Sequence, residues 1–267
     1  MPGSDRKIAP AAVTDIDDQP FVHVEKVSKT LGPLTAVSGV SFGVPQGNIC
    51  GLVGSDGAGK TTLLRMIATM IRPTAGNIFV GGLNVITQKA KVKEVIGYMP
   101  QRFGLYQDLT VAENIDFFMD IYGLAGAERT NRRDYYLGFS NLLPFLNRKA
   151  GDLSGGMKQK LGLACVLVHQ PSLLILDEPT NGVDPVSRQE FWGILAEMKQ
   201  KGMTILVSTA YLDEGEKCDQ LILMHNAQLL AIAAPQEIRA DFSDLEEAMI
   251  HRIQAIDNAL IEDNFGS

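Results

Sequence analysis

The sequence is poor in the residues from which redox and metal sites are built. It contains only three cysteines, Cys50, Cys165 and Cys218, and they lie too far apart in the chain to form a metal-binding or thiol-exchange motif. We therefore expect three small, buried side chains in a protein of a reducing compartment.

Long apolar runs and an excess of positive charge are also missing. No run approaches the ~20 apolar residues that a helix needs to span a bilayer, so a membrane role would depend on a partner. The N-terminal residues do not show a basic segment followed by an apolar stretch, and we expect no secretory signal. The formal net charge of -7 argues against a surface that coats nucleic acid, and no nucleic-acid partner is expected.

What the sequence does contain is a substantial apolar fraction arranged as alternating strands and helices. Hydrophobic residues make up 45% of the 267 residues, enough for a large core. Half-buried strands are expected at 21–27 and 37–44 on either side of a turn at Gly32. An apolar strand at 48–53 leads into a glycine-rich loop and a helix from 59 to about 69, which is the order strand, loop, helix.

The middle of the chain changes character and predicts a helical insertion within an α/β domain. Its helical periodicity covers 111–122, 128–140 and 154 to about 169. The α/β alternation then returns, and the sequence ends in antiparallel strands around a turn at Asn226. The elements expected in this part are a strand at 173–176, a helix at 186–200, and strands at 204–208, 220–224 and 229–233.

The two ends of the chain have different patterns. Residues 1–20 lack periodicity and are expected to form a mobile tail. Near the C-terminus, apolar residues at helical spacing predict an amphipathic helix that packs on the domain or, alternatively, contacts a second copy of the chain. These apolar residues are Leu245, Met249, Ile253, Ile256 and Leu260.

Residues 54–61 match the phosphate-binding pattern G-x-x-x-x-G-K-[ST] between a predicted strand and a predicted helix. The glycines let the backbone N–H groups curl around phosphates. Lys60 would supply a charge to the β- and γ-phosphates, and the Thr61 hydroxyl suits Mg²⁺. Asp56 is expected to point outward. The expected ATP-binding residues of this loop are Gly54, Ser55, Asp56, Gly57, Ala58, Gly59, Lys60, Thr61 and Thr62.

A second glycine motif, LSGGMKQKL at 153–161, opens the third helix of the insertion. Ser154, Gly155 and Gly156 would place free backbone N–H groups and a positive dipole end at a phosphate. Because the first loop already binds the chain's own nucleotide, the second motif indicates contact with the ATP of a neighbour.

An acidic pair follows the buried strand at 173–176. Asp177 at the carboxyl end of an inner strand can hold Mg²⁺, and Glu178 can orient or deprotonate an attacking water. Two buried acids without a cation would be costly, so the pair favours a nearby metal ion.

These motifs resemble the ATP-binding cassette family, and the resemblance covers about residues 21–240. In that family the first loop is Walker A, 153–159 is the signature, Asp177-Glu178 ends Walker B, Gln101 is the Q-loop glutamine, and Asp184 lies in the D-loop. The resemblance implies an α/β fold with a P-loop NTPase core, an inserted helical subdomain at about 102–165, and an antiparallel β subdomain. Residues 241–267 would form a C-terminal helix and tail.

The resemblance also implies cofactors and partners. ATP and Mg²⁺ would bind to the chain. Thr61, Gln101 and Asp177 would lie near the metal, and Glu178 and Gln101 would lie near the attacking water. Two cassettes, identical or different, would form a head-to-tail dimer in which each ATP lies between Walker A of one chain and the signature of the other.

Two positions depart from the family pattern. A histidine that contacts the γ-phosphate normally stands where this chain has Ala210, and an aromatic adenine platform is replaced by Leu31. Alanine cannot make the histidine's contacts, so we expect this site to bind ATP and hydrolyse it slowly. The sequence does not distinguish a natural substitution from one introduced to trap ATP; the likeness to some drug exporters favours the natural one. None of the other histidines is expected to take the place of the missing one. His23 should lie in a strand, His169 at a helix end and His225 in a turn.

The leading functional interpretation is an ATPase subunit that powers a membrane exporter from the cytoplasmic face of the cell membrane, bound peripherally to polytopic permease subunits. Asp56, 104–106 and Tyr211 resemble the first cassette of tandem-cassette exporters of the drug-export type. Phe103, Leu105 and Tyr106 are candidates for the permease-docking surface or, equally, for the core. The alternatives are a soluble ABC ATPase that acts on the ribosome or another assembly, and a catalytically weak half of a heterodimer.

Overall fold

The computed structural model describes residues 19–239, 242–251, 253 and 254. The expected N-terminal tail therefore lies outside the described residues, apart from its last two. Within the described residues, no helix has the length and apolar character that crossing a membrane requires.

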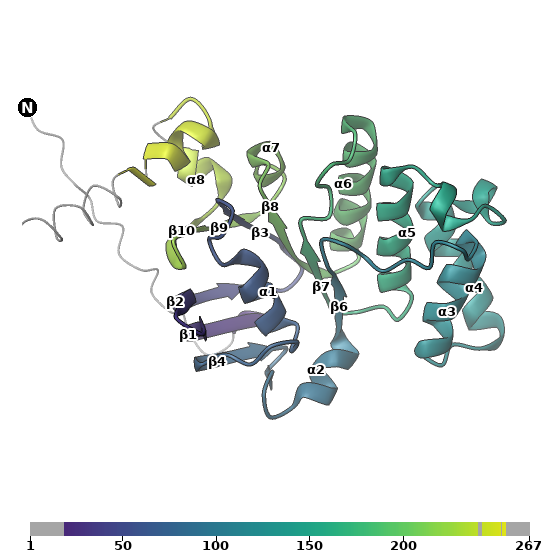
Figure 1. The fold of residues 1–267 in the computed structure, drawn as a ribbon, viewed down its shortest axis with the longest axis horizontal. Coiled ribbons are helices and arrows are strands. Elements are labelled where there is room, and N and C mark those ends of the chain that lie inside the picture. The colour runs from purple at the N-terminus through teal and green to yellow at the C-terminus, as the bar shows by residue number, and fades with distance from the viewer. Residues whose placement is uncertain (1–18, 240–241, 252, 255–267) are drawn as a thin grey trace, which may run out of the picture.

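The centre of the fold is a six-stranded sheet (Figure 1). Five neighbouring strands run parallel, and the edge strand β10 pairs antiparallel with β9. The run expected at 173–176 is an inner strand whose residues are all buried, as its continuous apolar pattern predicted. In sheet order the strands are β10 (Gln228–Ala233), β9 (Gln220–His225), β3 (Ile49–Gly54), β8 (Thr204–Thr209), β7 (Leu173–Asp177) and β6 (Ile96–Met99).

A second, antiparallel sheet lies beside the first and contains the N-terminal strands (Figure 1). Its first hairpin turns at Gly32, as expected. The sheet's third strand begins with three exposed residues and contains Gly76, so its sequence carries little of the alternation that predicts a strand. In sheet order the strands are β2 (Leu34–Val44), β1 (Val22–Leu31), β4 (Ala75–Val80) and β5 (Leu83–Asn84).

Helices and the second sheet cover the parallel sheet on both faces. Alternate residues of one strand enter different cores: Leu206 joins the core that contains α1 and the antiparallel sheet, whereas Val207 joins the core that contains α5 and α6. This alternation follows from the two-residue period of a strand. The helices are α1 (Lys60–Ile67), α2 (Lys89–Val95), α5 (Gly155–Leu167), α6 (Pro185–Gln200), α7 (Leu212–Gly215) and α8 (Pro235–Arg239).

The predicted helical insertion stands at one end of the molecule next to α5 (Figure 1). It contains α3 (Val111–Ile121) and α4 (Gly126–Phe139), followed by two short 3₁₀ turns. A reciprocal cap starts α3: the Thr110 hydroxyl accepts from the Glu113 N–H, and the Glu113 carboxylate accepts from the Thr110 N–H. The helix boundaries match the expected ones to within about two residues.

The remaining predictions concern the C-terminal helix and the cysteines. Residues 245–251 are helical, and Leu245 and Met249 pack on the main core, which agrees with the packing alternative. Ile256 and Leu260 lie outside the described residues. All three cysteines are buried and free, as expected.

Candidate functional site

The loop 54–61 leaves the carboxyl end of β3 and enters α1, and its backbone path requires glycine. Gly59 has φ +101°, and a Cβ there would lie 2.2 Å from the Ala36 carbonyl oxygen. A Cβ at Gly54 would lie 2.1 Å from the Met224 carbonyl oxygen. These clashes explain why the tight loop contains glycine at both ends. Asp56 is exposed at the loop surface, in line with the expected outward position.

Lys60 crosses the inside of this loop. Its ammonium donates hydrogen bonds to the carbonyl oxygens of Gly54 at 2.7 Å and Ser55 at 3.1 Å, and lies 3.7 Å from Glu178 Oε1. The side chain is buried, so its charge acts in a medium of lower polarity than water. This position gives the loop a fixed positive charge beside backbone N–H groups, which is the requirement for binding phosphate.

Asp177, at the end of β7, joins the loop to the two strands beside its own, β8 and β6. The Thr61 hydroxyl donates to Asp177 Oδ1 at 2.9 Å, and the Ser208 hydroxyl donates to the same oxygen at 3.0 Å. The Tyr98 hydroxyl lies 3.4 Å from Oδ2. Burial, together with the Asp177 charge, raises the pKa of Tyr98, so this phenol stays a donor at neutral pH.

The donors around Thr61 and Asp177 fit a magnesium ion. A hydroxyl and a carboxylate are hard oxygen ligands, and Mg²⁺ commonly takes only one or two carboxylates and fills its shell with water and phosphate. The described part of the chain holds no cluster of three or more His, Cys, Asp or Glu that could bind a metal by itself. A small protein ligand set of this kind suits a cation that arrives with a nucleotide.

Glu178 directly follows Asp177 and has a strained backbone conformation. Its φ of +48° is uncommon for a residue with a side chain, and its N–H is held by the Ser208 carbonyl at 3.2 Å and hydroxyl at 3.0 Å. Gln101 Nε2 donates to Glu178 Oε2 at 2.8 Å, and Asn181 Nδ2 donates to the same oxygen at 3.2 Å. The structure thus brings Gln101 against Glu178, and it connects Gln101 to Asp177 only indirectly.

Ala210 follows β8 directly and is exposed near Glu178. A hollow of about 10 Å³, roughly the size of one water molecule, lies between the two. Its lining offers no imidazole, and the alanine methyl group cannot donate a hydrogen bond. The hollow is lined by Glu178, Thr180, Asn181, Thr209, Ala210 and Tyr211.

The structure corrects the expected place of one histidine. His225 is the last residue of β9 and not part of the turn, and its Nδ1 lies 3.4 Å from the Ser55 hydroxyl at the edge of the phosphate loop. Strand β9 continues one residue further than predicted because His225 pairs with Gln228 of the neighbouring strand β10. His169 stacks on Tyr122 with ring centroids 4.0 Å apart, and His23 lies in β1, as expected.

The signature residues form the start of α5. Ser154 is its N-cap and accepts from the Met157 N–H at 3.3 Å, and Gly155 has nothing within 4 Å of where a Cβ would stand. Gly156 is closed in, because a Cβ there would lie 2.3 Å from Ser187. Asp184 caps α6 in the same way: the Ser187 N–H donates to it at 2.9 Å and lowers the pKa of Asp184.

The apolar residues that were predicted to contact adenine or a permease differ in their exposure to solvent. Leu31 ends β1 with 48% of its surface exposed, so it is available to a flat ligand. Of the docking candidates, Leu105 is a core residue, Phe103 packs against Phe118, and Tyr106 is 46% exposed. For Leu105 the structure agrees with the core alternative, because the loop turns this side chain inward.

Four residues near the site were not predicted from the sequence. Tyr98 and Ser208 are partners of Asp177, and Arg188 and Glu214 lie near Ala210. Ser208 ends a predicted strand next to the strand of Asp177, so a parallel-sheet argument could have found it. Arg188 and Glu214 lie in polar stretches that carry no such signal.

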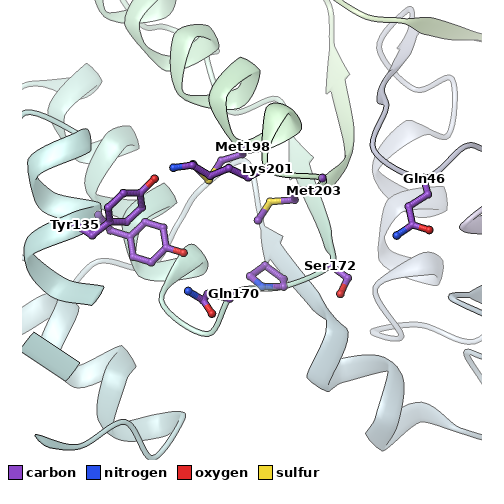
Figure 2. A pocket seen from close by; sticks show the side chains of 10 residues that line it. Gln46, Tyr135, Gln170, Ser172, Met198, Lys201 and Met203 are labelled. Carbon is purple, nitrogen blue, oxygen red and sulfur yellow. The ribbon is translucent and has the colours of Figure 1, made fainter. Parts of the chain in front are cut away.

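A larger hollow of about 470 Å³ lies away from these residues (Figure 2). It opens where β7 and β8 begin, so it is at the opposite edge of the sheet from the phosphate loop. In Figure 2 Lys201 extends toward Tyr135, and its ammonium lies 4.4 Å from the ring centroid. None of the predicted site residues lines this hollow, so size alone does not identify the functional site.

The fold and the phosphate loop define the chain as a P-loop nucleotide-binding domain with an inserted helical part. The sequence profile of the ABC transporter family matches residues 37–181. The chain is 35% identical over 219 residues to the linearmycin resistance ATP-binding protein LnrL of Bacillus subtilis (strain 168), which covers 82% of this chain and 70% of that protein. The chain therefore belongs to the ABC transporter family, as the resemblance indicated.

Two further comparisons agree. The chain is 48% identical over 203 residues to the probable multidrug ABC transporter ATP-binding protein YbhF of Escherichia coli (strain K12). That match covers 76% of this chain and 35% of YbhF, so the chain matches about a third of that relative's length. A solved ATP-binding subunit of an ABC transporter superimposes with a TM-score of 0.79 at 29% identity, covering 87% of this chain and 99% of the other. The expected fold class is confirmed.

Proposed function

We propose that the chain is the ATP-binding subunit of an ABC membrane exporter. Residues 21–240 would form its nucleotide-binding domain, bound to polytopic permease subunits at the cytoplasmic face of the cell membrane. The names of two relatives, a resistance protein and a probable multidrug transporter, support export of a drug-like compound. The observation that carries the proposal is the group of Lys60, Thr61, Asp177 and Glu178 around one phosphate loop.

The proposed substrate is ATP with Mg²⁺. Lys60 and the loop N–H groups would bind the phosphates, and Leu31 would pack on the adenine. Thr61 and Asp177 would hold the metal with help from Gln101, and the metal would neutralise phosphate charge. Glu178, held by Gln101 and Asn181, would orient the attacking water and accept its proton.

A second cassette completes the proposed ATP site. Ser154, Gly155 and Gly156 begin α5 with an open helix N-terminus, and Asp184 begins α6 beside it. Both starts would face the partner cassette, where the signature would contact the ATP bound by the partner's loop. ATP would then close the dimer, and product release would reopen it.

Hydrolysis at this chain's own site should be slow because of Ala210. Removing one charge-stabilising contact at a reacting group costs roughly 10²–10³ in rate. The combination of Ala210 with an intact signature favours a second candidate role, in which the chain is the weaker half of a heterodimer and its signature serves the more active site.

The proposed role can be tested by isolating the chain from its native membranes in detergent and identifying what accompanies it. A polytopic membrane protein that is retained by the wild-type chain supports the exporter. Ribosomal RNA or ribosomal proteins in its place would contradict it and support the soluble alternative. A second, different ABC cassette in the same complex would support the heterodimer.

A further inference from the structure

Helix α6 lies between α7 and α5 (Figure 1). Its first turns carry contacts to both sides. On one side is the segment after β8 that contains Ala210, which we call the switch segment (residues 209–214). On the other side is the signature helix α5. The two contacts use neighbouring residues of α6.

The contact to the switch segment is built around a buried carboxylate. Glu214 is fully buried; it accepts the Thr180 hydroxyl at 2.6 Å on Oε1 and the Thr209 hydroxyl at 2.6 Å on Oε2. Thr180 lies two residues after Glu178, and Thr209 directly precedes Ala210. One carboxylate therefore sets the spacing between the segment that follows the proposed base and the segment that bears the switch position.

Arg188 of α6 contacts this carboxylate and two other side chains of the switch segment. Its Nε lies 3.8 Å from Glu214 Oε1, an Nη lies 3.5 Å from Asp213 Oδ2, and the guanidinium carbon lies 4.3 Å from the centre of the Tyr211 ring. Within the described residues the Arg188 Nε–H has no hydrogen-bond partner. A distance of 3.8 Å is too long for a hydrogen bond, so Arg188 and Glu214 interact as an ion pair whose partners come from different elements.

The opposite side of α6 contacts the signature. Ser187, the residue before Arg188, is packed so closely on Gly156 that a Cβ on the glycine would lie 2.3 Å away. One turn further along α5, Lys160 donates to Glu190 of α6 at 2.6 Å. Lys160 is buried, so this ion pair holds the two helices in one register.

We infer that Arg188 is a positioning residue that couples the switch segment of this chain's own ATP site to its signature helix, through the first turns of α6. The inference rests on the proposed function, because the signature would contact the ATP of the partner cassette. Binding of ATP at the loop 54–61 would act on Glu178, which lies 3.7 Å from Lys60. Thr180, two residues further on, would pass the shift to Glu214 of the switch segment. Arg188 and Glu190 would then pass it to residues 153–161. The coupling has to be reciprocal, since it is a difference in binding free energy.

Amide hydrogen exchange of the full chain, with and without Mg·ATP, tests this in one measurement. The experiment is run at a concentration where sedimentation shows a monomer, so that no partner's ATP reaches the signature. Exchange at 54–61 reports ATP binding, and exchange at 153–161 reports the coupling. In the wild type we expect ATP to slow exchange in both segments, by more than about twofold at the signature.

The variants separate coupling from simple destabilisation. R188Q and E190Q should each keep the ATP-dependent protection of 54–61 and lose that of 153–161. A purely structural defect would instead speed exchange with and without ATP and leave the difference between the two states. Arg133→Gln, which removes a surface guanidinium on α4, is the matched control and should behave as the wild type.

Two outcomes overturn the inference while leaving ATP binding intact: protection of 54–61 alone in the wild type, or unchanged protection of 153–161 in R188Q. Absence of protection at 54–61 in the wild type would contradict the proposed ATP site itself, and with it the coupling.

Discussion

The Thr61 hydroxyl donates a 2.9 Å hydrogen bond to Asp177 Oδ1, although 116 positions separate the two residues in the chain. Thr61 is the last residue of the phosphate loop that follows β3, and Asp177 ends β7, two strands away from β3 in the same sheet. Carboxyl ends of parallel strands meet at one edge, so residues distant in sequence supply the two oxygen donors of one proposed metal site.

Replacement of Thr61 by Val should weaken ATP binding only when Mg²⁺ is present. The change keeps the shape of the side chain and removes the hydroxyl, and a hydrogen bond or ligand bond to a charged group contributes about 1.5–3 kcal/mol. We therefore expect Mg·ATP affinity to fall about 10- to 100-fold. Titration calorimetry with Mg²⁺ and with EDTA makes the comparison.

Thr87→Val, at an exposed position after β5, is the control for the threonine-to-valine change. It should leave both affinities at the wild-type value. An equal loss for Thr61→Val with and without Mg²⁺ would show that the hydroxyl contacts phosphate and not the metal.

The three thiols should be unreactive in the native protein at pH 8. Burial raises the pKa of Cys50 and Cys165 well above the usual range, and burial together with the charges of Asp219 and Glu214 raises the pKa of Cys218 to about 12. Because only thiolates react, labelling with a thiol reagent should be roughly three orders of magnitude slower than in denaturant.

An added surface thiol calibrates that measurement. Ala90→Cys places a cysteine at an exposed position of α2, where it should react quickly in the native state. Rapid native labelling of Cys50 or Cys218 would mean that β3 and β9 separate at their shared end on the timescale of the reaction.

Stability should decrease as the pH falls below about 7, and His169 should contribute to that decrease. Burial lowers the pKa of His169 in the folded chain, whereas an unfolded histidine titrates near 6.5. As the pH falls through this range the unfolded state takes up a proton that the folded state does not bind. The free energy of unfolding then falls, by at most about 1.4 kcal/mol per pH unit from one group.

Denaturant unfolding of His169→Gln between pH 8 and pH 5.5 checks this. The variant should show a shallower dependence on pH than the wild type. Tyr122→Ala, which removes the ring stacked on the imidazole and exposes it, should shift the dependence in the same direction. An unchanged slope in His169→Gln would assign the pH dependence to other groups.

The sequence was a good guide wherever local patterning and tertiary structure agree. The alternating strand β2 and the apolar strand β7 carry their burial in their own residues. Strands β4 and β6 and helix α2 were missed because they are short and contain glycine or lysine, so pairing with neighbours decides them. Similarly, the loop 54–61 is local, whereas the contacts of Asp177 depend on which strands become neighbours.

The same distinction explains the buried Glu214. Its sequence neighbours are polar, and a short acidic stretch normally predicts a solvated surface. Here two threonine hydroxyls and Arg188, which come from three separate segments, offset the free energy that is lost when water is removed from the carboxylate. Only the assembled structure shows that these segments meet.

Replacement of Ala210 by His should raise ATP turnover. Ala210 is exposed at the end of β8 beside Glu178, so an imidazole can be added without displacing core side chains. A donor at this position would stabilise charge on the γ-phosphate, and one such contact is worth up to about 10²–10³ in rate. Single-turnover hydrolysis by the chain assembled with its partner cassette measures the chemical step directly.

Two further variants test whether the gain in turnover is specific to this site. Ala90→His adds a histidine at an exposed position of α2 and should leave turnover unchanged. Combining Ala210→His with Glu178→Gln should abolish the gain, because the added imidazole would act on a water that Glu178 activates. If Ala210→His assembles normally and its turnover equals that of the wild type, the missing histidine is not the cause of slow hydrolysis, and the proposed weaker half of a heterodimer loses its chemical basis.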